Sequence, residues 1–510
     1  MKNTMHILAL TLALLMLVLA FAACGAKTET PVNEETTKQG QGNNETTPGS
    51  VKETETEAPK SAWEVFQDQH KSETLSDKYK DEDFVVSTYP DDEQIWGDVD
   101  WVGTDMTGDV IGDAVYTRNS MVEELYGITV VAEPREDYAS YTGLQREIQS
   151  GLSSADLINL PSKNALILAQ QELLQNFNQY EGIKLDSEWW DQNIIRDLSI
   201  GDTCFVLTGD IGTMYKKSIA VIMFNKELLE TVDYSEIGNP YALRHNRLWT
   251  IEKMVELGQL VSEDMNSDDQ YDENDRYGLI YFCNIASSAM IGAGVKYTTK
   301  NSDGIPELTF YDETTVDILY ELSELLYEKT LAWSWNANGK NEDTAFKMFQ
   351  QDQGLFYYGE LHAVATMRSM VSNFGILPMP LFDDAQESYH HTVNPDVAAF
   401  YVVPVTNEDS ERTGLIMDAL GAASRDYLTE AYYEKVLMGR VTRDEESRET
   451  LDIVINTINY DIGIQADIGI AEMMKKLVDS CKTDLAGEWS SQEGPIQSKL
   501  DDILKAFGVE

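Results

Sequence analysis

Short apolar runs alternate with helix-like segments along the chain from about residue 83. The runs are rich in β-branched and aromatic residues, as strands are, and the first three are DFVVST (83–88), ITVVAE (128–133) and ADLINL (155–160). Helices are expected at Asn119–Tyr126, Tyr141–Gly151 and Leu166–Leu174. This order favours an α/β fold with helices on both faces of a sheet.

Two further strands are expected at TCFVLTGD (203–210) and SIAVIMFN (218–225), on either side of the loop IGTMYKK. The chain has 510 residues. The roughly 450 residues that follow the N-terminal region are too many for one small core, so two lobes are expected.

The charge balance narrows the possible partners. The chain has 38 Lys and Arg against 88 Asp and Glu, a formal net charge of -50. So much negative charge opposes binding to nucleic acid or to an anionic membrane surface. We therefore expect no nucleic-acid partner.

The first 23 residues have the layout of a secretory signal peptide. Lys2 is followed by an apolar run from Ile7 to Ala20, interrupted only by Thr11. This run is short for a permanent membrane span. FAAC (21–24) resembles the bacterial lipobox, in which the Cys is lipidated, although the lipobox prefers Leu at the position of Phe21. Cys24 is therefore the predicted lipidation site, and a plain signal peptide is the alternative.

Residues 24–61 have almost no large apolar side chains, with stretches such as KTETPVNEETTK and VKETETEAPK. Such a segment cannot bury enough surface to fold, so it is predicted to be a disordered tether. Three cysteines remain beyond it: Cys204, Cys283 and Cys481. Their odd number and wide spacing imply no disulfide framework, and Cys204 and Cys283 are expected to be buried thiols.

Four segments, in this order, resemble bacterial extracellular solute-binding proteins. They are IAVIMFNKELLE (219–230), LWTIEKMVELGQLV (248–261), FGILPMPLFDDAQESYHHTV (374–393) and AYYEKVLMGRVTRDEESRETLDIVINTINYDIG (431–463). The similarity covers roughly residues 80 to 480. Together with the lipobox and the tether, the resemblance is to the lipoprotein substrate-binding subunit of a carbohydrate ABC importer.

That resemblance implies a two-lobed, periplasmic-binding-protein-like α/β fold with an interlobe hinge and a ligand cleft. It places lobe 1 at residues 62–218 and 397–450, and lobe 2 at 219–396 and 451–510. The implied ligand is a sugar or oligosaccharide, and the implied partners are importer permease subunits. A lipid-anchored monomer at the outer face of the cytoplasmic membrane is expected.

An acidic stretch, DMNSDDQYDEND (264–275), has oxygen-bearing side chains at alternate positions. Ca²⁺ takes six to eight oxygen ligands from such loops. The candidate ligands are Asp264, Asn266, Asp268, Gln270, Asp272 and Asp275. Asp269 stands where an EF-hand has Gly, and Asp275 stands where it has Glu. The stretch is therefore either a structural calcium site or a solvated acidic loop.

Aromatic faces and planar polar groups suit a neutral sugar. Two aromatic pairs stand out, at SEWWDQN and LAWSWNANGK, and the resemblance adds residues that commonly line the cleft. The candidate ligand-binding residues are Trp189, Trp190, Asp210, Trp333, Trp335, Tyr357, Tyr358, Glu360 and Tyr389. Each also has a structural reading: the Trp189–Trp190 pair as a cap on lobe 1, and Tyr357 and Tyr358 as core residues. His390 and His391 point apart on an extended segment and are predicted to be surface residues.

No enzyme motif supports catalysis. HExxH, GxSxG, a P-loop, GxGxxG and CxxC are all missing from the sequence. Glycoside hydrolysis, which needs only two carboxylates, is the weakest of the alternatives. A sensory protein that presents its ligand to a membrane receptor, and a binder of peptides or other organic solutes, stay open. With no apolar segment after residue 24 that could span a membrane, the chain is not expected to transport a solute by itself.

Overall fold

The computed structural model describes residues 59–70, 79–90, 100, 101, 103, 105–137, 140–282, 284–433 and 445–509. The chain divides into two units, at residues 1–58 and 59–510, and the fold below is that of the second unit. The predicted signal peptide, Cys24, almost all of the predicted tether and Cys283 lie outside the described residues. Within them, no helix is both long enough and apolar enough to cross a membrane.

The first sheet has four strands in the order β11-β3-β1-β2. Strand β1 runs parallel to β2 and β3, and β11 is antiparallel to β3. Every residue of β3 is buried, which explains its continuous apolar run. The strands are β1 (Asp83–Thr88), β2 (Thr129–Pro134), β3 (Leu157–Pro161) and β11 (Ala399–Val402). The first three strand predictions are therefore confirmed.

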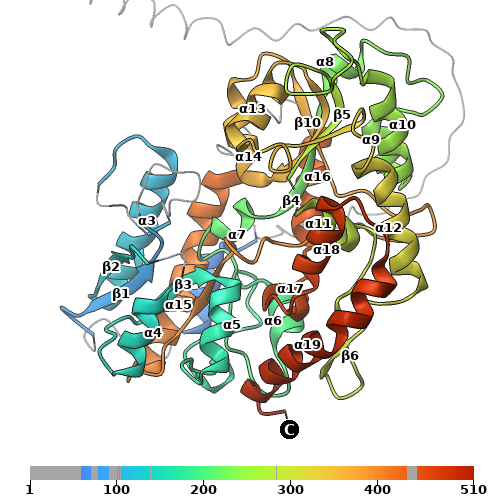
Figure 1. The fold of residues 1–510 in the computed structure, drawn as a ribbon. Coiled ribbons are helices and arrows are strands. Elements are labelled where there is room, and N and C mark those ends of the chain that lie inside the picture. The colour runs from blue at the N-terminus through green and yellow to red at the C-terminus, as the bar shows by residue number, and fades with distance from the viewer. Residues whose placement is uncertain are drawn as a thin grey trace, which may run out of the picture. The chain divides into compact units, whose positions relative to one another are not determined.

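Helices connect and cover this sheet (Figure 1). They are α2 (Ala62–Gln69), α3 (Val110–Tyr126), α4 (Thr142–Gln149), α5 (Ser162–Gln170), η1 (Phe177–Gln179), α6 (Gln192–Leu198), α7 (Met214–Lys217), α15 (Ser410–Ser424) and the π-helix η3 (Arg425–Thr429). Helix α3 begins nine residues before the predicted start, because Asp109 caps it by accepting from the Gly112 N–H. It ends at Gly127, which has a positive φ of 71°, as expected for a C-terminal cap.

The strand predicted at TCFVLTGD is wrong. Residues 203–208 form only isolated bridges, one of which pairs Leu207 with Tyr401 of β11. The next residue, Gly209, pairs instead with Trp190. A Cβ at Gly209 would lie 2.2 Å from the Trp189 carbonyl oxygen, so this close approach requires glycine. The chain therefore turns away from the sheet after a single bridge.

The second sheet has five strands in the order β10-β4-β9-β5-β8. Strand β5 is parallel to β8 and β9, whereas β4 is antiparallel to β9 and β10. All five are buried along their length. They are β4 (Ala220–Asn225), β5 (Tyr277–Tyr281), β8 (Ala332–Ser334), β9 (Gly354–Glu360) and β10 (Phe374–Leu377). The strand expected at SIAVIMFN is thus present as β4.

The other elements surround this second sheet or follow it in the chain (Figure 1). A hairpin joins β6 (Thr298–Lys300) to β7 (Pro306–Leu308). The helices are α8 (Lys226–Leu229), α9 (Pro240–His245), α10 (Ile251–Val261), α11 (Ile285–Gly292), α12 (Glu313–Leu326), α13 (Glu342–Gln350), α14 (Leu361–Thr366), η2 (Met367–Ser369), α16 (Glu445–Asn456), α17 (Ile462–Gln465), α18 (Ile470–Asp479) and α19 (Leu485–Ala506). Two mixed sheets with helices confirm the predicted α/β class.

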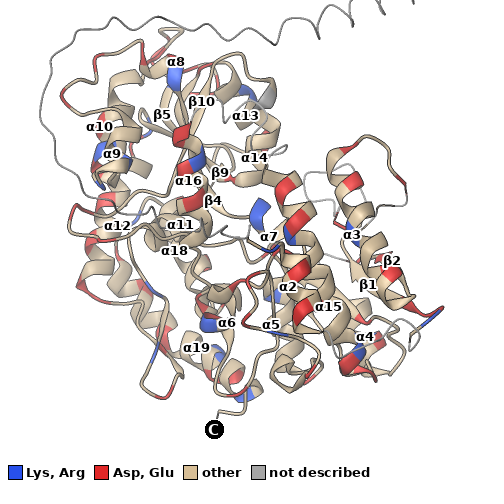
Figure 2. Ribbon diagram, turned by 180° about the vertical axis from the view of Figure 1, so that it is seen from behind, with Lys and Arg blue, Asp and Glu red and all other residues tan. Residues whose placement is uncertain are grey.

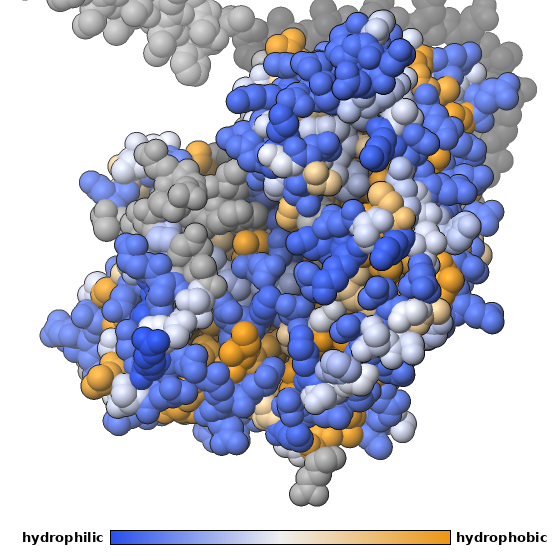
Figure 3. All heavy atoms as spheres, in the orientation of Figure 1, coloured by the Kyte–Doolittle hydropathy of each residue, from blue (hydrophilic) through white to orange (hydrophobic). Residues whose placement is uncertain are grey.

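The surface reflects the composition. Figure 2 shows acidic residues on many helices, with fewer Lys and Arg, in keeping with the net charge of -50. The face in Figure 3 is mostly hydrophilic, and its hydrophobic residues form scattered patches.

The chain passes between the two sheets in two adjacent segments. It leaves the first sheet between α7 and β4 and returns between β10 and β11. The segments pair at Ile219 and Val393, and the Asn394 N–H donates to the Ser218 carbonyl at 3.1 Å. The predicted boundaries near 218 and 396 fall in these segments, whereas the one near 450 falls inside α16. The division into lobes at these boundaries stays a prediction.

Glu360 is buried beside these connecting segments, at the end of β9. Its Oε1 accepts from Asn394 Nδ2 at 2.8 Å, and its Oε2 lies 3.7 Å from His362 Nδ1. Burial, which opposes the charged form, raises the pKa of Glu360 from 4.5 to about 7 despite the neighbouring His362.

This pKa shift predicts a pH-dependent stability. Folded Glu360 keeps its proton up to about pH 7, whereas unfolded Glu loses it near 4.5. The free energy of unfolding therefore falls as pH rises through that window. Between pH 4.5 and 8, ionisation of Glu360 should lower the free energy of unfolding by about 3 kcal/mol, and Glu360→Gln should abolish this decrease. Urea unfolding at both pH values measures the difference. Exposed Glu472→Gln is the control, and an unchanged pH dependence in Glu360→Gln would contradict the assignment.

Candidate functional site

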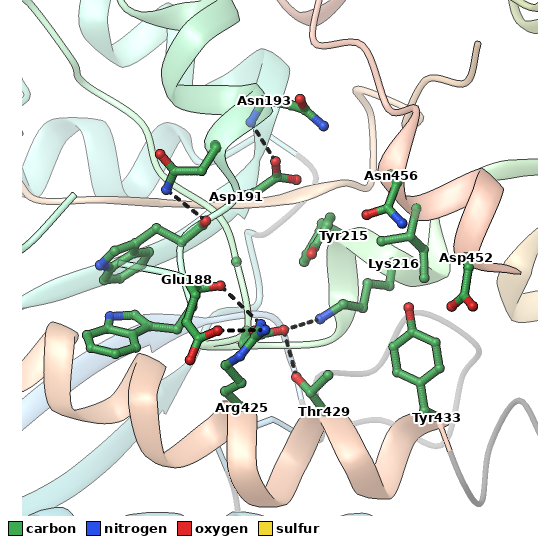
Figure 4. A pocket seen from close by; sticks show the side chains of 16 residues that line it. Glu188, Asp191, Asn193, Tyr215, Lys216, Arg425, Thr429, Tyr433, Asp452 and Asn456 are labelled. Atoms are coloured by element: carbon green, nitrogen blue, oxygen red, sulfur yellow. Dashed lines mark hydrogen bonds and ion pairs between the residues drawn. The ribbon is translucent and has the colours of Figure 1, made fainter. Parts of the chain in front are cut away.

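A cavity of about 470 Å³ lies between the loops that follow Ser187 and Thr208, helix η3 and helix α16 (Figure 4). Its lining combines carboxylates, amides, two cations and aromatic residues. The lining residues are Glu188, Trp189, Trp190, Asp191, Gln192, Asn193, Gly209, Asp210, Tyr215, Lys216, Arg425, Thr429, Tyr433, Asp452, Ile455 and Asn456.

The buried carboxylate of Asp210 holds one side of this cavity together. Its Oδ1 lies 3.0 Å from Lys216 Nζ and accepts from Thr429 Oγ1 at 2.9 Å. Its Oδ2 accepts from Arg425 at 2.7 Å (Figure 4). Burial alone would raise the pKa of Asp210, but the charges of Lys216 and Arg425 outweigh it and hold that pKa below its ordinary value. Asp210 is therefore ionised and fully engaged.

Helix η3 brings two of these partners to the same carboxylate. It continues α15 as a π-helix, and Arg425 and Thr429 both reach Asp210. Arg425 also donates to the Glu188 carboxylate at 3.2 Å. Single turns of π-helix occur frequently at functional sites. Here the π-turn joins the loop at Glu188 to the loop at Asp210.

The second side of the cavity comes from the chain that follows η3. In Figure 4, Tyr433, Asp452 and Asn456 lie on one side of Lys216, and Arg425 and Thr429 lie on the other. Asp191, at the N-cap of α6, accepts from the Tyr460 hydroxyl at 2.7 Å. Burial raises the pKa of Asp191.

The chemistry of the cavity suits an uncharged, hydrogen-bonding ligand. Four carboxylates and two cations line it. The cations are already paired with Asp210, so they offer little to an anionic ligand. Amide, hydroxyl and carboxylate groups beside tyrosine rings can hydrogen-bond hydroxyls and pack against C–H groups.

Three of the nine predicted ligand-binding residues line this cavity: Trp189, Trp190 and Asp210. Both tryptophans are almost fully buried, and both indole N–H groups donate to Asp418 Oδ1 at 2.8 Å. Their rings belong to the core that includes α15. Their backbones shape the loop, because the Asp210 N–H donates to the Trp189 carbonyl.

The other predicted residues do not line this cavity. Trp333 is buried in β8, and half-buried Trp335 stacks on Phe282 at a centroid distance of 4.5 Å. Tyr357 and Tyr358 are buried in β9. Tyr389 donates its hydroxyl to the Arg244 carbonyl at 3.1 Å. Their contact with ligand, like that of Glu360, stays a prediction.

The sequence predicts that His391 lies on the surface, and this prediction is wrong. It is fully buried, accepts from the Met379 N–H at 3.1 Å and lies 2.8 Å from Thr457 Oγ1. Burial lowers the pKa of His391 to about 3, so the ring is neutral. The chain around His391 turns the ring inward. There the ring links the segment between β10 and β11 to Thr457, directly after α16. Cys204 is buried, as predicted.

The acidic loop at 264–275 is curled by its own side chains. Asp264 accepts from the Ser267 and Asp269 N–H groups, and buried Asp275 accepts from Met265 and Asp272. Asp269, at the position that an EF-hand gives to glycine, has a φ of 62°. Among the described residues, no three His, Cys, Asp or Glu side chains gather closely enough to hold a metal ion.

Sequence reasoning missed Lys216, Arg425, Thr429, Tyr433, Asp452 and Asn456. Tyr433 and the last two lie in the segment 431–463 that carries the resemblance, so they were available as candidates. Lys216 lies six residues after Asp210, in helix α7. Arg425 gives no signal in the sequence, because its role depends on the π-turn that brings it to Asp210.

Comparisons with known proteins bear on the fold. No protein-family profile matches the chain, and no curated protein matches it either. An ABC substrate-binding protein from Listeria monocytogenes in complex with cycloalternan matches with a TM-score of 0.52 and 13% identity, over 84% of this chain and 100% of the other. A cyclo/maltodextrin-binding protein complexed with maltotetraose matches with a TM-score of 0.52 and 14% identity, over 84% of this chain and 97% of the other.

The GacH receptor of Streptomyces glaucescens, solved unliganded and with acarbose, matches with a TM-score of 0.51 and 11% identity, over 84% of this chain and 99% of the receptor. At such identities the similarity concerns the fold. The chain thus has the periplasmic-binding-protein-like fold of these carbohydrate-binding proteins, which confirms the architecture that the sequence resemblance implies.

Proposed function

We propose that this protein is a solute-binding protein that captures a sugar or oligosaccharide in the cavity beside Asp210. The observation that carries this proposal is the lining of that cavity, in which paired cations leave amide, hydroxyl and carboxylate groups beside tyrosine rings. The similar solved proteins are bound to cycloalternan, maltotetraose and acarbose. Carbohydrate is therefore the ligand class with the best support.

The position of the cavity suggests how binding is coupled to a change of shape. One side consists of the loops around Asp210 and helix η3, and the other includes α16, which packs against β10 of the second sheet. The two connecting segments between the sheets lie side by side and pair at Ile219 and Val393, an arrangement about which a hinge can act. A ligand that contacts both sides only when they approach shifts the equilibrium towards the closed form.

Substitutions of Tyr433 and Asn456 test this site and leave the residues of the Asp210 ion cluster unchanged. We expect Tyr433→Ala and Asn456→Ala each to weaken binding of the best sugar by about tenfold, because each removes one packing or hydrogen-bond contact. Isothermal titration against maltotetraose, cycloalternan, acarbose and monosaccharides measures this. Tyr320→Ala, an exposed aromatic outside the cavity, is the control. Binding of peptides but of none of these sugars would move the assignment to another solute class.

We also propose that Cys24 is lipidated and that the anchored protein delivers its ligand to an ABC importer. Two acyl chains give the stable anchoring that one chain does not. Cys24→Ser should leave ligand affinity unchanged, release the protein from the membrane fraction at high salt and reduce cellular uptake of the ligand. Membrane retention would refute lipidation as the anchor. Normal uptake after deletion of the protein would favour a sensory role.

Calcium in the acidic loop is a third part of the proposal. The loop is already curled at the positive φ angles of Ser267 and Asp269, and a bound ion would draw the carboxylates of Asp264, Asp268 and Asp272 away from the backbone N–H groups that they now accept from. Bound Ca²⁺ raises the unfolding midpoint, because it binds only the folded loop. We expect an excess of chelator to lower the thermal unfolding midpoint by roughly a few degrees, and added calcium to restore it. The double variant Asp268→Asn, Asp272→Asn should lose this response, whereas Asp303→Asn should keep it. No response in the unmodified chain would leave a solvated acidic loop.

A further inference from the structure

A second, larger cavity of about 960 Å³ lies on the side of the second sheet. Helices α10 and α12 form its walls, together with the chain around α9 and the loop after Leu381. None of the residues that line it also lines the cavity beside Asp210. We call it the α10–α12 groove.

The groove is strongly negative. Eight carboxylates line it, at Glu236, Glu252, Glu256, Asp317, Glu321, Glu324, Asp383 and Asp384. Lys253 is the single cation in its lining, and its Nζ lies 2.6 Å from Glu256. The other seven carboxylates have no cation in the groove lining to offset them. Figure 2 shows the same excess of acidic residues along α10 and α12.

Burial and neighbouring carboxylates act together on one of these groups. Glu321 lies on α12 and is half-buried. Burial, together with the charges of Glu252 and Glu324, raises the pKa of Glu321 to about 7. A cationic group placed in the groove would relieve this repulsion.

Apolar side chains are exposed among these charges. Tyr320 is 63% exposed and Leu248 is 43% exposed, and both line the groove. Half-buried Ile237, Val255 and Phe382 continue the apolar lining. Exposed apolar side chains scattered singly over a surface are ordinary, but these line one groove together. The groove therefore offers apolar contact and negative charge together.

We propose that the α10–α12 groove docks a Lys- or Arg-bearing amphipathic polypeptide segment of a partner protein. Charge complementarity selects this occupant. A second copy of this chain, with its own charge of -50, would be repelled. The acidic segment 25–61 of the same chain would be repelled as well. A small metal ion would make no use of Tyr320 and Leu248. The proposal is independent of the sugar-binding site.

The test uses the whole folded chain and a fluorescein-labelled, 14-residue Lys/Leu amphipathic helix as the probe, with anisotropy as the readout. The triple variant Glu252→Gln, Glu321→Gln, Glu324→Gln should raise the Kd about tenfold, since three charge contacts with the lysines of the probe are lost. The matched triple variant Glu181→Gln, Glu472→Gln, Glu493→Gln removes the same charge elsewhere and should change the Kd by less than about twofold. Equal losses in the two triple variants would mean general attraction to an acidic chain and would overturn the proposal.

The apolar part of the groove has its own test. The double variant Leu248→Ser, Tyr320→Ser should raise the Kd of the Lys/Leu probe about fivefold or more, because contact with its leucines is lost. Val371→Ser, at a side chain 94% exposed outside the groove, is the control. A Kd unchanged in the double variant would show that only charge acts there and would also overturn the proposal. Both substituted sites are exposed, and unfolding midpoints check that the variants remain folded.

Discussion

The buried carboxylate of Asp210 is the interaction on which the candidate site depends. It joins Lys216, which lies just before the first connection between the sheets, to Arg425 and Thr429 of η3. Loss of one partner from such a cluster leaves a buried charge without compensation, which costs much more than a surface ion pair does. The cluster therefore holds the loop, the start of the connection and the π-helix in one arrangement.

Behind this cluster, a second buried carboxylate supports the same wall. Asp418 on α15 accepts from both indole N–H groups of Trp189 and Trp190, and its other oxygen lies 3.0 Å from His70 Nε2. His70 follows α2, whose N-terminal N–H groups donate to Asp426 of η3. The tryptophans thus serve the core, and the loops that they fix place Asp191 and Asp210 at the cavity.

The cavity beside Asp210 and the α10–α12 groove differ in chemistry. The cavity beside Asp210 has its cations paired internally and presents amide, hydroxyl and carboxylate groups beside tyrosine rings, which suits a polyol. The α10–α12 groove has carboxylates without matching cations and exposed apolar side chains, which suits a basic amphipathic segment. A binding protein with both would recognise its solute and a protein partner through separate surfaces.

The sequence by itself determined the strands β1 to β4 and the α/β class, because buried strands need continuous or alternating apolar runs whatever their neighbours are. It also pointed to Asp210, through the Gly-Asp pair, and to the segment that contains Tyr433. It could not place Trp189 and Trp190 in the core, predict the inward turn of His391, or show that TCFVLTGD leaves the sheet at Gly209. The positions of the two tryptophans depend on Asp418, 229 and 228 residues away, and that of His391 depends on Thr457, 66 residues away. Tertiary structure alone decided which polar groups were satisfied internally and which remained free to line a cavity, because a hydrogen bond depends on distances that local sequence does not specify.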